Sequence, residues 1–353
     1  MTAAVPDQIS ENAYAVTPRQ AKEYITDCML AGLVPYLVSS PGMGKSSIAK
    51  AIAKEQNLKI IDHRLSTSAP EDLSGLPRFD EDGKARFSPF ADLFPLEDTP
   101  IPEGYSGWLL LLDEFPSASK AVQAAAYKLV LDRQVGQHNL HPNVAIMAAG
   151  NKATDRAIVN PISTALQSRM VHLELELDFD EWLMDVALKQ NYDKRIIAFL
   201  SQYPSKLMDF KPDHHDKTFC CPRTWEFMNK LVSGKSMPDD KAPLYAGTIT
   251  SGVAVELIQF TKVFNSMVKV EDILRDPENT LLPGDNATRW AVISSMMEKI
   301  SEKTFGNLAI YANRFPLDFR ILFFRSTMVR NAELRKHPAF AKAMSELTKY
   351  LSM

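Results

Sequence analysis

The chain has 353 residues, of which 45% are hydrophobic and 24% are charged, the balance of a folded globular protein. This length exceeds what one ordinary core accommodates and suits two or three domains. A net charge of −3 excludes the overall basic character that is typical of nucleic-acid-binding proteins. The sparse cysteines make no disulfide framework and the apolar runs are too short to cross a bilayer. We therefore expect a cytoplasmic protein without a membrane partner.

The first part of the chain alternates between helix and strand. Residues 1–16 are expected to form a loose arm, and Thr17 is expected to cap the first helix. Two apolar strands, Val34–Val38 and Leu58–His63, flank a helix over Lys45–Lys54. This order favours a parallel sheet with helices on both faces.

The stretch Val38–Ser47, VSSPGMGKSS, is predicted to be a phosphate-binding loop between the first strand and the helix that follows it. Gly42 and Gly44 let backbone N–H groups turn toward a polyphosphate without side-chain clash, and the helix points its positive end at the anion. Lys45 can reach the outer phosphates. Ser39 stands where the G-x-x-x-x-G-K-[ST] pattern has its first glycine. The residues predicted to bind the nucleotide are Pro41, Gly42, Met43, Gly44, Lys45, Ser46 and Ser47.

Two adjacent carboxylates follow a buried apolar run. Trp108–Leu112 predicts a strand buried on both faces, and Asp113 and Glu114 come directly after it, a pair that packing explains poorly. Beside a phosphate loop, Asp113 and the Ser46 hydroxyl would hold Mg²⁺, and Glu114 would polarise the attacking water. Asn151 ends the next apolar strand. A lone asparagine there is normally a turn residue, but its position relative to the other motifs favours a bond to the γ-phosphate and to that water.

The long polar stretch before the predicted strand Trp108–Leu112 contains an insertion. Arg78–Phe87 alternates around an Asp-Gly turn and predicts a β-hairpin, which belongs to no simple strand–helix–strand unit. Phe79 and Phe87 are expected to be a cross-strand pair that holds this hairpin together. Val135–Leu140 predicts a short turn or a second hairpin. Insertions on a rigid scaffold often carry specific function.

Strands stop after Asp178, and helices dominate the rest of the chain. We expect a core domain over residues 1–178, a small helical domain over 179–236 and a helical C-terminal region over 237–353, with the linker Ser233–Pro243 near the second boundary. The expected helices are Glu181–Gln190, Lys194–Gln202, Arg223–Val232, Leu244–Phe264, Ala287–Lys303 and a last stretch from Pro316.

Several motifs in fixed order make the chain resemble an AAA+ ATPase, and within that superfamily the MoxR branch, over roughly its first two thirds. The motifs are SSPGMGKS (Ser39–Ser46), EDLSG (Glu71–Gly75), LLLLDE (Leu109–Glu114), AAGN (Ala148–Asn151), ALQSRM (Ala165–Met170) and CPRTWEF (Cys221–Phe227). The resemblance implies an α/β fold with a parallel five-stranded nucleotide-binding core, a helical lid and a mostly α-helical C-terminal region. It also implies ATP and Mg²⁺ as cofactors. The ATPase would work as a homo-oligomeric ring, usually a hexamer, that remodels or assembles a partner protein, commonly one with a von Willebrand A-like domain.

The resemblance assigns roles to arginines outside the phosphate loop. Arg169 matches the arginine finger that one subunit inserts into the site of its neighbour, where it stabilises charge that develops on the transferred phosphoryl group. Arg223 matches the sensor arginine of the helical lid, which reads the γ-phosphate. Arg156 is either a second finger or a solvated loop arginine.

Two other functions stay open at this point. A nucleic-acid motor or loader on the same core would need a basic, aromatic-lined groove, for which the slightly acidic chain offers little beyond Lys84, Arg86 and His138. A nucleotide-dependent scaffold with little turnover would have no need for Glu114. GTP is an alternative to ATP, because no residue identifies the base.

Overall fold

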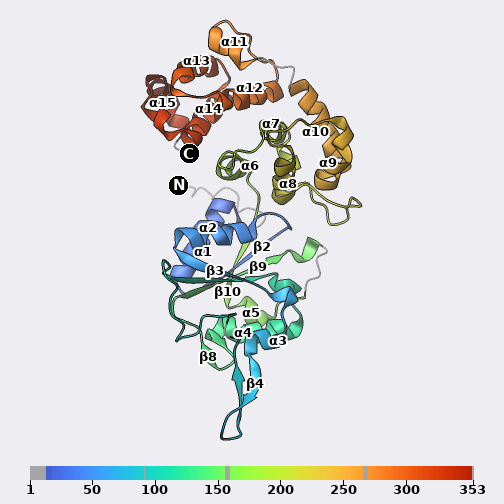
Figure 1. The fold of residues 1–353 in the computed structure, drawn as a ribbon, viewed down its shortest axis with the longest axis vertical. Helices are drawn as coiled ribbons and strands as arrows, with labels where there is room; N and C mark the ends of the chain where they lie inside the picture. Colours follow the sequence, from blue (N-terminus) through green and yellow to red (C-terminus); the bar gives the residue numbers. More distant parts are fainter. Residues whose placement is uncertain (1–12, 91, 156–159, 265–268, 352–353) are drawn as a thin grey trace, which may run out of the picture. The chain divides into compact units, whose positions relative to one another are not determined.

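The computed structural model describes residues 13–90, 92–155, 160–264 and 269–351. It divides into two compact units, Met1–Asp178 and Phe179–Met353, which are described separately (Figure 1). A further boundary near residue 237 remains a prediction. Arg156 lies outside the described residues.

The first unit contains a parallel six-stranded sheet in the order β1-β10-β2-β9-β6-β3. Together with the helical second unit, this confirms the predicted α/β fold. The sheet has one strand more than expected, because part of the predicted loose arm pairs with β10 through bonds from the backbone N–H groups of Glu174 and Glu176 to the carbonyls of Tyr14 and Val16. The strands are β1 (Ala15–Val16), β2 (Val34–Ser39), β3 (Leu58–Arg64), β6 (Gly107–Asp113), β9 (Val144–Asn151) and β10 (Met170–Leu175).

Helices cover both faces of this sheet (Figure 1). α1 (Pro18–Leu30) and α2 (Lys45–Glu55) pack on one face, and α3 (Pro70–Ser74), α4 (Lys120–Asp132) and α5 (Thr164–Gln167) pack on the other. Alternate side chains of each buried strand pack against the helices on opposite faces of the sheet, since successive residues of a strand point to opposite faces. In β6, Leu109 and Leu111 join the α1–α2 layer and Leu110 and Leu112 the other.

Local sequence signals set the helix starts of this unit. Thr17 caps α1 in a reciprocal capping box, in which its hydroxyl accepts from the Gln20 backbone and the Gln20 side chain accepts from the Thr17 backbone. Ser119 caps α4 by accepting from the N–H of Val122.

Two hairpins extend from the layer that contains α3 and α4. β4 (Leu76–Phe79) pairs with β5 (Ala85–Ser88), and β7 (Gln134–Val135) pairs with β8 (His138–Asn139). The expected pairing of Phe79 with Phe87 is wrong. Phe79 lies opposite Ala85, because the backbone N–H of Asp80 bonds to the carbonyl of Lys84 across the turn and thereby fixes the register.

The second unit is helical among its described residues. Its helices are α6 (Phe179–Trp182), followed by a π-helical turn (Leu183–Ala187), α7 (Lys194–Gln202), α8 (Pro222–Val232), α9 (Ala242–Ile249), α10 (Ser251–Phe264), α11 (Val270–Arg275), α12 (Asn286–Glu298), α13 (Glu302–Ala312), α14 (Leu317–Arg330) and α15 (Pro338–Leu351). No described helix is both long and apolar enough to cross a membrane.

Three expected helices of this unit have different bounds. The helix predicted over 244–264 is broken at Thr250, whose φ of +77° is incompatible with a helix. The helix predicted over 287–303 ends at Glu298, because Ser301 caps a new helix. The helix predicted over 181–190 is instead α6 with its π-helical turn.

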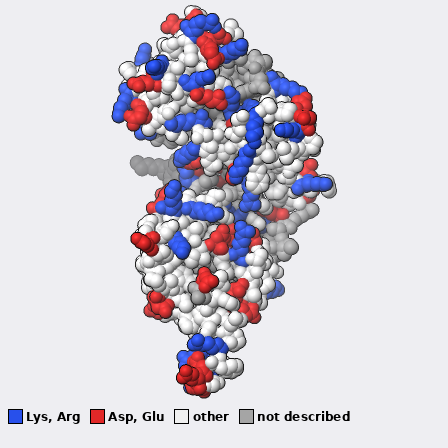
Figure 2. All heavy atoms as spheres, viewed as in Figure 1, with Lys and Arg blue, Asp and Glu red and all other residues white. Residues whose placement is uncertain are grey.

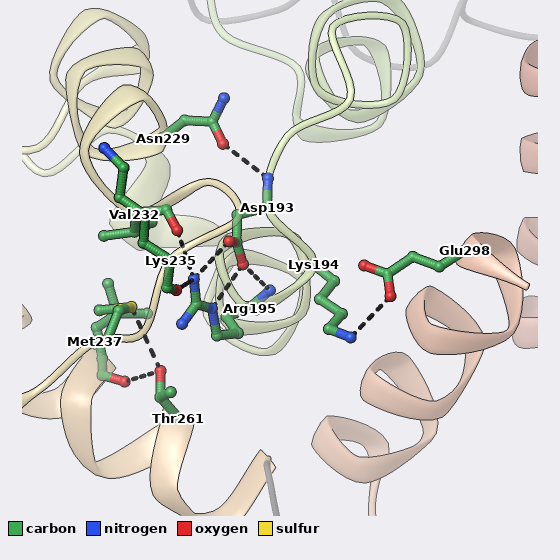
Figure 3. A network of polar contacts seen from close by, with 10 residues as sticks. Asp193, Lys194, Arg195, Asn229, Val232, Lys235, Met237, Thr261 and Glu298 are labelled. Atoms are coloured by element: carbon green, nitrogen blue, oxygen red, sulfur yellow. Dashed lines mark hydrogen bonds and ion pairs between the residues drawn. The ribbon is translucent and has the colours of Figure 1, made fainter. Parts of the chain in front are cut away.

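A buried ion pair lies within the second unit (Figure 3). Asp193 and Arg195, at the start of α7, are both almost fully buried, and Arg195 bonds to Asp193 and to the carbonyls of Val232 and Lys235. The same side chain thereby connects α7 to the C-terminal end of α8.

Candidate functional site

The predicted site residues of the first unit gather at the carboxyl ends of the central strands. From β2 the chain crosses through α2 to β3 at one edge of the sheet, whereas β9 leads to β10 on the other side of β2. In open α/β sheets such a reversal of strand order leaves a crevice at the carboxyl ends, where ligands bind. The loop after β2 lies at this point.

Two glycines give this loop its path. Gly42 has a φ of +79° and Gly44 a φ of +93°, a region that residues with a side chain rarely adopt. Gly44 is the N-cap of α2, so the backbone N–H groups of the first turn have no partner within the helix. The loop therefore directs donors and the positive end of the helix dipole toward one place, an arrangement that binds phosphate.

Lys45 is held inside the loop. Its side chain is buried, with Nζ 2.9 Å from Asn151 Oδ1 and 3.0 Å from Ser39 Oγ. Ser39 replaces the first glycine of the pattern without strain, because it continues strand β2 and is not among the residues with positive φ. The serine also supplies an oxygen that glycine would lack. Both of these partners are neutral oxygens that a phosphate can replace.

Ser46 and Asp113 provide hard oxygen ligands side by side. Ser46 Oγ donates to Asp113 Oδ2 at 2.9 Å, and the backbone N–H of Glu114 donates to Asp113 Oδ1 at 2.8 Å. Mg²⁺ usually binds proteins through one or two such groups and keeps water and phosphate oxygens as its other ligands. No cluster of three or more His, Cys, Asp or Glu suited to a metal occurs among the described residues. This donor set fits Mg²⁺ bound together with a polyphosphate.

The Glu114 carboxylate accepts a hydrogen bond from the hydroxyl of Ser66. Glu114 has a left-handed backbone, with φ of 56°, which turns the chain sharply as it leaves β6. Ser66 lies in a short 3₁₀ turn (Leu65–Thr67) directly after β3, the neighbour of β6 in the sheet. Ser66 lies in a long polar stretch of the sequence in which no site residue was predicted. Its position at the carboxyl end of an adjacent strand was the available signal.

Gly150 allows close packing behind Glu114. A Cβ atom at Gly150 would lie 2.3 Å from Cδ of Pro116, so no larger residue fits without a shift. Pro116 belongs to the 3₁₀ turn Phe115–Ser117 that follows Glu114. The glycine before Asn151 therefore fixes the turn that carries the carboxylate.

Burial shifts the pKa of two side chains of the sheet near the site. It raises the pKa of Tyr36, and it is the main cause that lowers the pKa of His63, against the opposing charges of Asp72 and Asp62. Tyr36 and His63 are therefore neutral at pH 7.

Arg169 is exposed on the first unit, in the turn between α5 and β10. Its guanidinium lies 5.6 Å from the ring centroid of Tyr127, and Nη1 donates to the carbonyl of Ala165 and to Ser168 Oγ, each at 3.0 Å. Arg223 is exposed in the first turn of α8, in the second unit. The structure thus brings together the predicted residues of the phosphate loop, Asp113, Glu114 and Asn151, and it holds Arg169 in a defined position.

Comparisons with known proteins identify no family. No family model matches the chain, and no curated protein matches it. Among solved structures it is similar to one RuvB mutant of Thermotoga maritima at 16% identity, covering 72% of this chain and 77% of that chain with a TM-score of 0.36. A second RuvB mutant gives 17% identity, 82% and 85% coverage and a TM-score of 0.36. A third structure is described as the RuvB Holliday junction branch migration motor of Thermotoga maritima. It gives 16% identity and a TM-score of 0.34, and the match covers 72% of this chain and 76% of that chain.

Proposed function

We propose that the protein is an AAA+ ATPase that binds ATP with Mg²⁺ at the loop after β2 and hydrolyses it to ADP and phosphate. This proposal rests on two contacts that link the loop after β2 to the ends of β9 and β6. Lys45 meets Asn151 from β9, and Ser46 meets Asp113 from β6. A cation, a hydroxyl and a carboxylate around the N–H groups at the start of α2 suit a magnesium polyphosphate.

Each residue has a separate task in this reaction. Lys45 exchanges its contacts with neutral oxygens for the outer phosphates. Ser46 and Asp113 hold Mg²⁺, which when bound neutralises charge on the phosphate oxygens. Glu114 accepts a proton from the attacking water once its carboxylate leaves Ser66, and Asn151 orients that water. No described residue identifies the base, so GTP is the alternative nucleotide.

The position of Arg169 supports a ring in which neighbouring subunits share sites. Its guanidinium is exposed, and its three contacts are with Tyr127, Ala165 and Ser168, none of which belongs to the phosphate loop. A cation presented in this way can stabilise the transition state in an adjacent subunit, which couples hydrolysis to assembly. We assign Arg223 the role of a lid sensor on the motif alone. The ring, usually a hexamer, would be of the MoxR type.

The β4–β5 hairpin favours a protein as the target of this ATPase. Pro77, Phe79, Ala85 and Phe87 occupy directly opposed pairs and hence one face, and 77% of Phe79 is exposed. The opposite face has arginines that pair with Asp80. Figure 2 shows acidic and basic side chains together at the hairpin tip, which suits a protein surface better than a phosphate backbone. We propose that the partner protein has a von Willebrand A-like domain.

The test of the shared site is ATP turnover per subunit at rising protein concentration, for wild type and for an equal mixture with Arg169→Ala. Turnover per subunit should climb, and the mixture should fall below the average of its components. Arg169→Lys is the matched control, because it keeps the charge but loses the bidentate fork, and it should restore only part of the activity. Flat turnover and simple additivity would show that each subunit works alone.

The target class is tested with two probes, a reduced and carboxymethylated polypeptide and a single-stranded oligonucleotide. We expect the polypeptide to stimulate turnover in wild type and not in Phe79→Ser, while basal turnover stays the same in both proteins. Stimulation by the oligonucleotide that weakens with salt would instead favour a nucleic-acid motor.

A further inference from the structure

The second unit contains a partly enclosed cavity where α7, α12 and α14 meet, and none of the proposed ATPase residues lines it. Its volume is about 30 Å³. One water molecule needs about 10–15 Å³ of such volume, so this cavity has room for a few waters or for one compact ion. Its polar lining consists of Tyr192, Lys194, Ser294, Glu298, Ser326 and Arg330.

The lining contains two cations and one carboxylate. Lys194 Nζ lies 2.9 Å from Glu298 Oε2 (Figure 3), and the same carboxylate also acts on Arg330. The remaining lining charge is the guanidinium of Arg330, at the C-terminal end of α14. The cavity thus has one positive charge more than it has negative charges.

The guanidinium of Arg330 has a buried N–H donor for which no described residue provides a hydrogen-bond acceptor. Its Nε is buried and has no hydrogen-bond partner among the described residues. Burial also lowers the pKa of Arg330, while Glu298 acts in the opposite direction. A buried guanidinium N–H without an acceptor is costly, because its hydration is lost and nothing replaces it. An acceptor with negative charge would satisfy both the donor and the excess cation.

We propose that this cavity binds a compact inorganic anion, such as sulfate or chloride, at its Arg330 end. The hydroxyls of Ser294 and Ser326, both at least nine-tenths buried, supply further donors. The Glu298 carboxylate, which also acts on Arg330, repels an anion and so limits the affinity of the cavity for it. The bound ion ties α14 to α7 and α12, and its presence stabilises the second unit.

The experiment uses the full chain with Lys45→Ala, which weakens anion binding at the phosphate loop. Thermal unfolding and titration calorimetry are measured with sulfate and with chloride at constant ionic strength. We expect saturable binding and a Tm that rises with anion concentration. Arg330→Gln should weaken binding about tenfold or more, whereas Arg325→Gln, on the same helix but not in the lining, should leave it unchanged.

A second variant works in the opposite direction and does not depend on loss of structure. Glu298→Gln removes the only lining carboxylate among the described residues and should strengthen anion binding several-fold. Binding that is absent from the parent, or that is equal in the parent, Arg330→Gln and Glu298→Gln, would overturn the proposal. These outcomes are independent of ATP turnover.

Discussion

Replacing Arg195 with methionine should destabilise the second unit strongly. The Arg195 and Asp193 side chains are 9% and 7% exposed, and the guanidinium bonds to both carboxylate oxygens of Asp193 at 2.8 and 2.6 Å. The same group donates to the carbonyls of Val232 and Lys235, each at 2.8 Å (Figure 3). Methionine preserves the volume but leaves a buried carboxylate and two carbonyls without this donor.

The expected loss is about 3–5 kcal/mol, the usual result of removing one partner from a buried ion pair. The second unit has 175 residues, the difference between 353 and 178. For a unit of this size each kcal/mol lowers the Tm by about 2–4 °C, so a fall of about 10 °C is expected. The double variant Asp193→Asn with Arg195→Met should recover part of this loss, because its buried side chain is neutral.

Tryptophan fluorescence is the appropriate assay, because Trp182, Trp225 and Trp290 lie in the second unit and only Trp108 in the first. The control is Lys230→Met, which breaks an exposed i,i+4 pair and should cost less than about 0.5 kcal/mol. If the Arg195 variant loses no more stability than this control, the network is not the structural support described here.

Three further predictions concern the site and the helices. Gly150→Ala should lower both stability and ATP turnover, because its Cβ would displace Pro116 and the turn that carries Glu114. Ser66→Ala should raise basal turnover several-fold with little change in nucleotide affinity, since Glu114 no longer has to give up a hydrogen bond before it acts. Thr250→Gly should raise the unfolding free energy by about 1 kcal/mol, because a β-branched residue at a φ of +77° is strained.

Each of these changes has a matched control. Gly247→Ala meets no atom within 4 Å and should be neutral or stabilising in its helix, and an equal loss there would refute the packing argument for Gly150. Ser68→Ala, two residues from Ser66, should leave turnover unchanged. Thr248→Gly, inside α9, should lower stability, and a gain there would contradict the strain assigned to Thr250.

The central sheet and the strand–loop–helix path at Gly42 and Gly44 could be predicted from the sequence because their signals are local. A buried parallel strand appears as a short apolar run, as at Trp108–Leu112, and the spacing of Gly42, Gly44 and Lys45 is contiguous in the chain. The order of these runs along the chain then places their carboxyl ends at one edge of the sheet.

The remaining features depend on contacts between distant residues. The two-residue strand β1 forms only because β10 presents a free edge, and Ser66 gains its role only because β3 lies beside β6. The break at Thr250 falls in a run whose apolar pattern is continuous, so periodicity alone predicts one helix. Arg195 is buried only because the carbonyl of Val232, at the end of α8, and that of Lys235 accept hydrogen bonds from it.

The proposal that this protein hydrolyses ATP at the loop after β2 is tested by measuring Mg²⁺-dependent ATP hydrolysis together with binding of a fluorescent ATP analogue. The variants are Glu114→Gln and Lys45→Ala. The account predicts that Glu114→Gln binds the analogue as wild type does but loses about 100-fold or more in turnover, whereas Lys45→Ala loses binding. Turnover that survives in Glu114→Gln, or analogue binding that survives in Lys45→Ala, would contradict it.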